Sequence, residues 1–222
     1  MTDTRLTLAV LGGTGAEGSG LAFRWAHKGH KVIVGSRAAE KAQQAASELN
    51  ASLGRDIVRG ADNLSATGEA DVAILTVPYA AQRSTIEGVR SALVGKILID
   101  VTVPLVPPKV SRVQLPADGS AVESLQKLLG PEVKVVSAFQ NVSAHHLKDL
   151  HHTVECDVLV CSDDNDAAEI AIRLAKDAGL RGIYAGPLSN SVVAEGLTSV
   201  LIAINRRYKV PAAGIRITGI PD

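Results

Sequence analysis

Residues 6–18, Leu-Thr-Leu-Ala-Val-Leu-Gly-Gly-Thr-Gly-Ala-Glu-Gly, decide the fold of this protein. The apolar run Leu6–Leu11 predicts a buried strand, and the glycine-rich turn after it opens a helical pattern that continues to about Lys28. Glycines 13, 15 and 18 have the G-x-G-x-x-G spacing of a turn that binds a pyrophosphate. Gly13 permits the tight turn, Gly15 lets the backbone approach the phosphates, and Gly18 lets the helix pack on the strand. The order of strand, turn and helix therefore predicts a dinucleotide site near the N-terminus.

The rest of the chain alternates short β-branched runs with helical patterns, which is typical of an α/β fold with a doubly wound parallel sheet of the Rossmann type. We expect a nucleotide-binding domain over residues 1–140 and a small C-terminal α/β extension over residues 141–222. Four prolines between residues 104 and 119 predict a loop near the carboxyl edge of the sheet. Further strands are predicted at 31–35, 56–58, 71–77, 96–103, 133–138, 157–161 and 182–185, and helices at 38–53, 80–90, 120–129, 166–178 and 191–208.

Composition excludes several classes of protein. The 222 residues carry 23 Lys and Arg against 23 Asp and Glu, so a nucleic-acid partner is not expected. No apolar stretch is expected to reach the ~18–20 residues of a membrane span, and the first residues have no secretory pattern. Two cysteines, Cys156 and Cys161, cannot build a disulfide framework. We therefore expect a cytoplasmic protein whose partner is a small molecule, with neither nucleic acid nor membrane.

The end of the second predicted strand indicates which dinucleotide binds. An NAD site would place Asp or Glu about 20 residues after the glycines, to hold the ribose hydroxyls. This chain has Ser36 and Arg37 there, with Lys41 one helical turn further and Thr14 in the glycine turn. A hydroxyl, a guanidinium and an ammonium suit a 2′-phosphate, and no carboxylate repels it. The sequence therefore predicts NADP.

Two later strands end in proline-containing segments that we expect to line the same cleft. These are Val77-Pro78-Tyr79 and Thr102-Val103-Pro104. Ligands of doubly wound sheets lie beyond the carboxyl ends of the strands, so Val77, Pro78 and Val103 are candidates for the nicotinamide end of NADP. Proline also ends strands that have no function, and this simpler interpretation stays open.

Five segments together carry a resemblance to a known family. The chain resembles the NADPH-dependent reductases of coenzyme F-420, a deazaflavin, over nearly its whole length and in matching order. The segments are Leu11-Gly-Gly-Thr-Gly, Val34-Gly-Ser-Arg37, Leu75-Thr-Val-Pro78, Val135-Val-Ser-Ala138 and Ala185-Gly-Pro-Leu-Ser-Asn-Ser191.

The resemblance implies a small homodimeric enzyme that moves a hydride between NADPH and the deazaflavin in one cleft. It places Thr14, Ser36, Arg37 and Lys41 at the 2′-phosphate, and the turn Gly15, Ala16 and Glu17 at the pyrophosphate. The chain departs from the family where Phe139-Gln-Asn-Val-Ser143 replaces Leu-His-Thr-Ile-Pro, and where Tyr79-Ala-Ala81 replaces a segment with Trp and His. The segments that bind NADP therefore match the family, whereas the segments that would line the acceptor pocket differ from it.

The acceptor is expected to stack over the nicotinamide at the carboxyl ends of three strands. Apolar walls would exclude water, and two side-chain amides could bind the carbonyl edge of a planar ring. Hydride transfer between two rings needs positioning more than an acid or base, so no catalytic side chain is predicted. The candidate acceptor residues are Tyr79, Pro104, Ala138, Gln140, Asn141 and Val142.

Two alternatives to deazaflavin reduction stay open at this stage. One is an NADPH-dependent reductase of another acceptor, flavin-like or a carbonyl or imine. The other is a redox-silent NADP-binding sensor, although the sequence has no DNA-binding helix pair or basic face. The predicted helix 191–208 has apolar residues on more than one stripe, which favours a homodimer contact.

Two polar clusters suggest metal binding but fit no established pattern. The histidines between His145 and His152 and the two cysteines match no zinc-site spacing, so we predict a solvated turn and a buried, inert Cys161. The run Asp163-Asp-Asn-Asp166 lacks the glycine and distal Glu of a calcium loop, and it is better explained as a helix cap. No metal is predicted.

Overall fold

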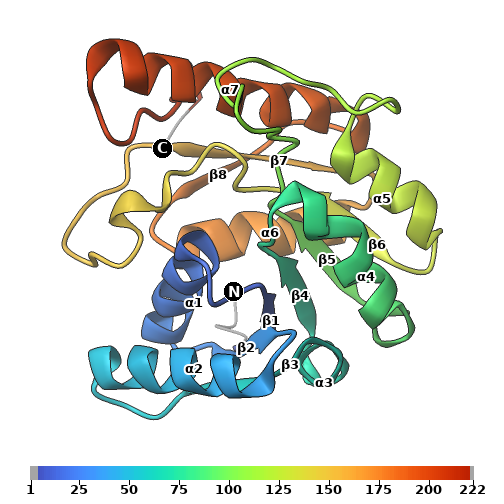
Figure 1. Ribbon diagram of the computed structural model, residues 1–222, viewed down its shortest axis with the longest axis vertical. Coiled ribbons are helices and arrows are strands. Elements are labelled where there is room, and N and C mark those ends of the chain that lie inside the picture. Colours follow the sequence, from blue (N-terminus) through green and yellow to red (C-terminus); the bar gives the residue numbers. More distant parts are fainter. Residues whose placement is uncertain (1–4, 221–222) are drawn as a thin grey trace.

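One sheet of eight strands organises the chain (Figure 1). The computed structural model describes residues 5–220, and the strand order is β3-β2-β1-β4-β5-β6-β7-β8. Neighbours from β3 to β6 are parallel, β7 is antiparallel to β6, and β8 is parallel to β7. The sheet and its flanking helices confirm the predicted α/β doubly wound fold. The strands are β1 (Thr7–Leu11), β2 (Lys31–Ser36), β3 (Val58–Asp62), β4 (Val72–Leu75), β5 (Ile97–Asp100), β6 (Lys134–Ser137), β7 (Asp157–Ser162) and β8 (Arg181–Tyr184).

Helices cover both faces of the sheet because successive strand residues point to opposite sides. In β1, Leu8 and Val10 join a core with α1, α2 and α6, while Ala9 and Leu11 join a second core with α3, α4 and α5. The last helix, α7, lies along the top of Figure 1 and contacts α5 and β7. The helices are α1 (Ala16–Lys28), α2 (Ala39–Leu53), α3 (Asn63–Glu69), α4 (Tyr79–Leu93), α5 (Ala121–Leu129), α6 (Asn165–Asp177) and α7 (Ser191–Tyr208), with short 3-10 turns η1 (Ala144–His146) and η2 (Leu188–Asn190).

Gly18 has the packing role that the sequence predicted. A Cβ atom on Gly18 would lie 2.3 Å from Thr76 Oγ1 and 2.9 Å from the Cα of Gly13, so only glycine lets α1 begin this close to β1 and β4. Gly29 ends α1 in the left-handed conformation, with φ of 107°, as the sequence predicted. Asp164 caps α6 by accepting a hydrogen bond from the Ala167 amide at 2.8 Å, which confirms the capping interpretation of the acidic run.

Three details differ from the sequence prediction. The third strand lies at Val58–Asp62 rather than 56–58, where it pairs with Val32–Ser36 of β2. Gly60 within it passes so close to α2 that a Cβ atom there would lie 2.2 Å from the Gln43 amide nitrogen. Helix α3, of seven residues, follows at once and was not predicted, since a segment this short has little periodicity. The division of the chain near residue 140 stays a prediction, and β7 and β8 extend the sheet of the first part.

Helix α7 also corrects an expectation. The segment Leu188–Tyr208 is long and apolar enough, by length and composition alone, to cross a membrane. One side of the helix packs on the protein and buries Ser191, Ala194, Glu195, Ser199 and Leu201, whereas the apolar Val193, Val200 and Ile204 stay exposed.

Candidate active site

A pocket of about 200 Å³ lies at the carboxyl ends of β1, β2 and β4. The glycine turn, the end of β2 and the start of α4 meet there. This arrangement brings together six of the predicted cofactor residues: Thr14, Gly15, Ser36, Arg37, Val77 and Pro78. Other predicted residues lie outside its lining: Gly13 is buried beneath the turn, Ala16 and Lys41 are exposed on α1 and α2, and Glu17 and Val103 are half-buried.

The chemistry of this pocket suits a phosphorylated nucleotide. Ser36 and Arg37 supply a hydroxyl and an exposed guanidinium at the end of β2, and none of the lining residues within the described part of the chain is a carboxylate. The first turn of α1 faces the same space, and its free amides favour anionic oxygen. The residues present therefore fit NADP, whose 2′-phosphate would lie at Ser36 and Arg37.

Five lining residues were not among the predicted site residues: Gly12, Asn63, Thr76, Ala81 and Thr85. Asn63 follows β3. Because the sequence analysis placed that strand at 56–58, it did not identify Asn63 as a residue at the carboxyl end of a strand. Its Oδ1 atom is buried without a hydrogen-bond partner among the described residues. A buried carbonyl oxygen without a partner is costly, and a nucleotide hydroxyl or amine would satisfy it.

Glu17 gives the glycine turn an unusual carboxyl. It lies in the first turn of α1, half-buried, and burial raises its pKa to about 8. At neutral pH the side chain is therefore mostly protonated. A neutral acid avoids the repulsion that a carboxylate would exert on a bound pyrophosphate.

A polar cluster lies beneath the cleft at the end of β5. Asp100 is fully buried, and its carboxylate accepts hydrogen bonds from Gln82 Nε2 at 2.6 Å and from the Thr102 amide at 2.9 Å. Burial raises the pKa of Asp100 to about 6. Gln82 also donates to Thr102 Oγ1 at 2.8 Å, so it holds the end of β5 against α4.

The predicted acceptor residues after β6 are buried and bound within the protein. The Gln140 amide donates to the Asp100 carbonyl at 2.7 Å, and its Oε1 atom has no partner among the described residues. Asn141 Nδ2 donates to the Ala194 carbonyl at 2.8 Å on α7. Ala138 and Val142 are also buried. Gln140 therefore keeps a buried polar atom without a partner among the described residues, whereas the Asn141 Nδ2 group links this segment to α7.

The backbone is strained at the same place. Phe139 has a φ of 72°, a left-handed conformation that is rare for a bulky residue. Its ring packs edge-on against Trp25, with ring centroids 5.8 Å apart. Strain of this kind persists where the surrounding structure holds it and is often found at functional sites. The two other predicted acceptor residues lie on neighbouring elements, Tyr79 half-buried at the start of α4 and Pro104 buried after β5.

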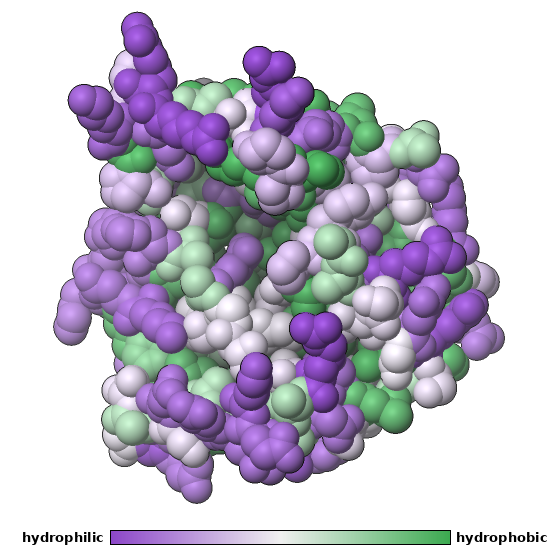
Figure 2. Space-filling view, viewed as in Figure 1, coloured by the Kyte–Doolittle hydropathy of each residue, from purple (hydrophilic) through white to green (hydrophobic). Residues whose placement is uncertain are grey.

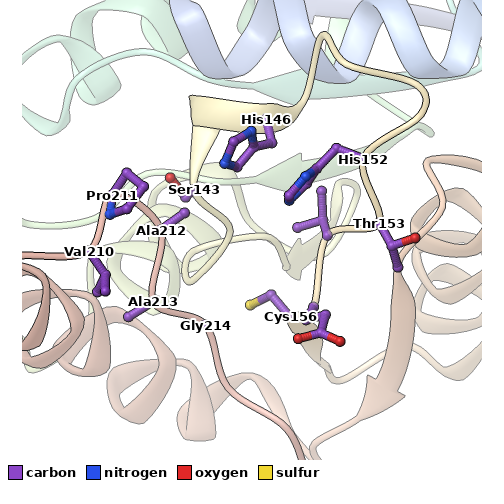
Figure 3. Close-up of a pocket in the computed structure, with 12 residues that line it drawn as sticks. Ser143, His146, His152, Thr153, Cys156, Val210, Pro211, Ala212, Ala213 and Gly214 are labelled. Atoms are coloured by element: carbon purple, nitrogen blue, oxygen red, sulfur yellow. The ribbon is translucent and has the colours of Figure 1, made fainter.

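A larger cavity, of about 570 Å³, lies beyond the end of β6 (Figure 3). Residues 143–156 form one wall and the segment Val210–Gly214 forms the other. His146 and His152 lie nearly parallel, with ring centroids 3.8 Å apart, and both line the cavity. Burial, together with the charges of His152 and His145, lowers the pKa of His146. The predicted solvated turn is thus partly correct, since His145 and His152 are exposed, but the sequence did not reveal the cavity.

The cavity connects to the predicted acceptor segment. Cys156 Sγ is 3.4 Å from the carbonyl oxygen of Asn141 and faces the cavity (Figure 3). Both cysteines are free and buried, and burial raises their thiol pKa values, that of Cys161 to about 11. The predicted inert Cys161 is confirmed. Figure 2 shows this face hollowed between the part that carries α7, at the top, and the part that carries α1 and α2, below.

One buried arginine positions the histidine loop, which we define as residues 144–152. Arg24 on α1 donates to the carbonyls of His146, Leu147, Asp149 and His152 at 2.7–3.2 Å, and to Ala178 at 3.0 Å. Gly20, one turn earlier, leaves room for Leu147. The helix that begins at the dinucleotide pocket therefore also holds the wall of the larger cavity.

Comparison with known proteins agrees with these features. The family model described as NADP oxidoreductase coenzyme F420-dependent matches residues 7–104. The F420-dependent NADP reductase of Methanocaldococcus jannaschii is 43% identical over 97% of this chain and 99% of its own. That of Methanothermobacter marburgensis is 45% identical over 98% of this chain and 100% of its own.

A solved structure shows the same architecture. A candidate F420-dependent NADP reductase from Arthrobacter sp. FB24 superposes with a TM-score of 0.77 at 25% identity, covering 96% of this chain and 99% of that one. The fold, the glycine turn and the matches over nearly the full length all agree. The chain therefore belongs to the family of coenzyme F420-dependent NADP oxidoreductases.

Proposed function

We propose that this protein is an oxidoreductase that transfers a hydride between NADPH and the deazaflavin coenzyme F420. Near-complete matches to relatives named F420-dependent NADP reductases carry this proposal. The pocket chemistry supports it independently, since Ser36 and Arg37 suit a 2′-phosphate and no carboxylate lines that pocket. The family also favours the deazaflavin over the flavin-like, carbonyl and imine acceptors, and over a redox-silent sensor.

The residues of the chain bind and orient the two reactants. Ser36 and Arg37 would hold the 2′-phosphate, the turn Gly15–Glu17 the pyrophosphate, and Val77 and Pro78 the nicotinamide end. NADPH supplies the hydride when bound, so the protein needs to bring two rings together and exclude water. No side chain is required to act as an acid or base in the hydride step.

We further propose that the acceptor occupies the hollow from the end of β5 to the cavity beside the histidine loop. Neighbouring strands are ~4.8 Å apart, so the end of β6 lies ~10 Å along the sheet from the end of β4. A planar ring beside the nicotinamide would therefore reach Gln140, whose Oε1 lacks a partner among the described residues. The cavity of about 570 Å³ beyond it offers room for the rest of the molecule.

A panel of acceptors tests this function. NADPH oxidation is followed by the loss of dihydronicotinamide absorbance with coenzyme F420, a flavin, an imine and a carbonyl compound. We expect oxidation with F420 at a rate far above that with the others. Activity with an imine alone would favour the alternative reductase, and tight nucleotide binding without turnover of any acceptor would favour the sensor. Gln140→Ala and Tyr79→Ala should weaken F420 turnover, and full activity of both variants would show that the acceptor site is elsewhere.

We also propose a homodimer that forms through α7. We define the α7 apolar face as Val193, Val200, Ile204 and Tyr208, whose side chains are 65%, 44%, 36% and 71% exposed. The loop after β5 adds exposed Val106, Val113 and Leu115, and it passes close to α7, since a Cβ atom on Gly196 would lie 3.4 Å from Val113 Cγ1. A contiguous exposed apolar surface of this kind marks an interface.

We propose that the protein works in the cytoplasm. Its two cysteines are free, as is typical of proteins in a reducing compartment.

A further inference from the structure

Asp100 is a buried carboxylate without a cation partner among the described residues. Its side chain is fully inaccessible, and it accepts hydrogen bonds from the Gln82 amide, at 2.6 Å, from the Thr102 backbone amide, at 2.9 Å, and from the Thr102 hydroxyl. Buried charges in proteins are usually paired with an opposite charge, because dipoles alone compensate desolvation incompletely. The position of Asp100 relative to the dinucleotide pocket indicates a role for this negative charge.

Asp100 lies one layer of side chains behind the dinucleotide pocket. In the sheet it is paired with Leu75, two residues before Val77, which lines the pocket. With ~4.8 Å between strands and ~3.3 Å per residue, the backbone of Asp100 is ~8 Å from that of Val77. On α4, Ala81 and Thr85 line the pocket, while Gln82 between them turns inward to the carboxylate. The nicotinamide end of NADP would thus lie ~10 Å from this charge.

A charge at this distance acts differently on the two forms of the cofactor. NADPH has a neutral dihydronicotinamide ring. When that ring gives a hydride, with its two electrons, to the acceptor, it is left with one positive charge, and the acceptor takes a proton from solvent. A fixed negative charge stabilises the cationic ring and leaves the neutral ring unaffected. At an effective dielectric constant near 20, one charge ~10 Å away changes affinity by about tenfold.

We propose that Asp100 strengthens binding of NADP⁺ relative to NADPH through its negative charge, and so favours hydride transfer from NADPH. Gln82 is a positioning residue in this proposal, because its amide orients the carboxylate and supports its ionised form. The inference rests on the proposed nucleotide site and is independent of the identity of the acceptor.

The surroundings of Asp100 determine how this effect depends on pH. Glu195 on α7 is the titratable group recorded as acting on it, and its negative charge raises the pKa of Asp100. Cys161 on β7 faces Glu195, and burial keeps that thiol neutral. The neighbours on α4 and in the segment after β6 are Gln82 and Gln140, which do not titrate. With a pKa of about 6, Asp100 is ionised at pH 8 and mostly protonated at pH 5.

The test is the ratio of the dissociation constants for NADP⁺ and NADPH, measured by calorimetry without acceptor. At pH 8 we expect Asp100→Asn to raise this ratio about tenfold, mainly by weakening NADP⁺. The matched control is Asp157→Asn, which removes a buried carboxylate that Arg181 neutralises and should leave the ratio unchanged. Lowering the pH from 8 to 5 should raise the wild-type ratio with a midpoint near 6 and leave that of Asp100→Asn flat. Titration of the 2′-phosphate cancels, because both nucleotides carry it.

A second variant covers the case in which Asp100→Asn does not fold. Gln82→Leu removes the amide that favours the ionised carboxylate, so the midpoint of the pH dependence should move upward from its wild-type value. A ratio for Asp100→Asn within twofold of wild type, or a wild-type ratio that does not change with pH, would overturn the proposal. If the wild-type protein bound neither nucleotide, the proposed function itself would fail.

Discussion

The guanidinium of Arg24 donates from Nε to the backbone carbonyl of Leu147 at 2.7 Å, across 123 positions of the sequence. Through this contact, helix α1 holds the wall of the larger cavity, while its first turn forms part of the predicted pyrophosphate site. The two halves of the candidate active site are therefore built on one helix.

Removing this guanidinium should destabilise the protein strongly. Arg24→Ala removes the arginine donor from five carbonyls, of which those of His146 and Asp149 keep a backbone donor, so we expect a loss of at least ~3 kcal/mol in the free energy of unfolding. Urea denaturation of the variant and the wild-type protein measures this loss. The control is Arg55→Ala, since Arg55 is exposed and also donates to α1 carbonyls, at Ala26 and His27, and should cost below ~1 kcal/mol. Equal losses for the two variants would contradict this role.

The nucleotide preference should depend on Arg37. A charge-assisted hydrogen bond to a phosphate contributes ~1.5–3 kcal/mol, so Arg37→Ala should narrow the preference for NADPH over NADH by one to two orders of magnitude. Titration of both nucleotides by fluorescence measures the two affinities. Arg83→Ala, which removes an exposed arginine paired with Glu87 on α4, should leave the preference unchanged. Equal affinity of the wild-type protein for NADPH and NADH would refute the 2′-phosphate site.

Ionisation of Glu17 should make stability depend on pH. Its pKa is raised to about 8 in the folded state, against ~4.3 in an unfolded chain. The unfolded state therefore loses this proton first, and the free energy of unfolding falls as the pH rises from ~4.3 to about 8. Glu17→Gln should be more stable than wild type by at least ~1 kcal/mol at pH 9, since one pKa unit is worth ~1.4 kcal/mol. Denaturation curves at pH 4 should coincide for the two proteins, and a difference of the same size at both pH values would count against this effect.

Asp157 should have the opposite pH dependence. It accepts a paired hydrogen bond from Arg181, at 2.8–3.0 Å, and one from the Ile217 amide at 2.6 Å, which ties the C-terminal segment to β7. The hydrogen bond from Arg181, followed by that from Ile217, lowers the pKa of this carboxyl. Its stabilisation is therefore present above pH ~4 and is lost as the pH falls through the lowered folded value.

Asp157→Asn should accordingly cost ~1.5–3 kcal/mol at pH 7. The difference from wild type should shrink as the pH falls below ~4, because the unfolded state of the wild-type protein then binds a proton that the folded state binds only at lower pH. Thermal denaturation at pH 7 and pH 3 measures both values. A cost that stays constant between these pH values would show that the carboxylate charge is not what holds the segment.

The α7 apolar face should control assembly. The double variant Val193→Lys and Val200→Lys places two charges on a face that we propose a second copy covers. Light scattering should return twice 23.1 kDa for the wild-type protein and 23.1 kDa for the variant. Val94→Lys, at an equally exposed apolar position at the end of α4, is the control and should stay dimeric. A wild-type mass of 23.1 kDa across micromolar concentrations would refute the dimer.

Local patterns in the sequence determined the fold class and the nucleotide pocket. Alternating strands and helices are short-range features, and the glycine turn follows from three positions within six residues. Ser36 and Arg37 stand directly after a strand, so their place at the carboxyl edge follows from chain order alone. Chain order also explains the missed residue: the sequence analysis placed β3 a few residues too early, so Asn63 was not expected at the carboxyl edge.

The cavity and the buried contacts on the predicted acceptor side were determined by the tertiary structure alone. The cavity beside the histidine loop forms between residues 143–156 and 210–214, which are distant in the chain, and an arginine on α1 holds one wall. Asn141 looks free in the sequence, but its amide binds α7, while Asp100 becomes a buried charge because β5 ends beneath α4. Burial and hydrogen-bond partners are set by long-range packing, and a sequence pattern of short period carries no information about them.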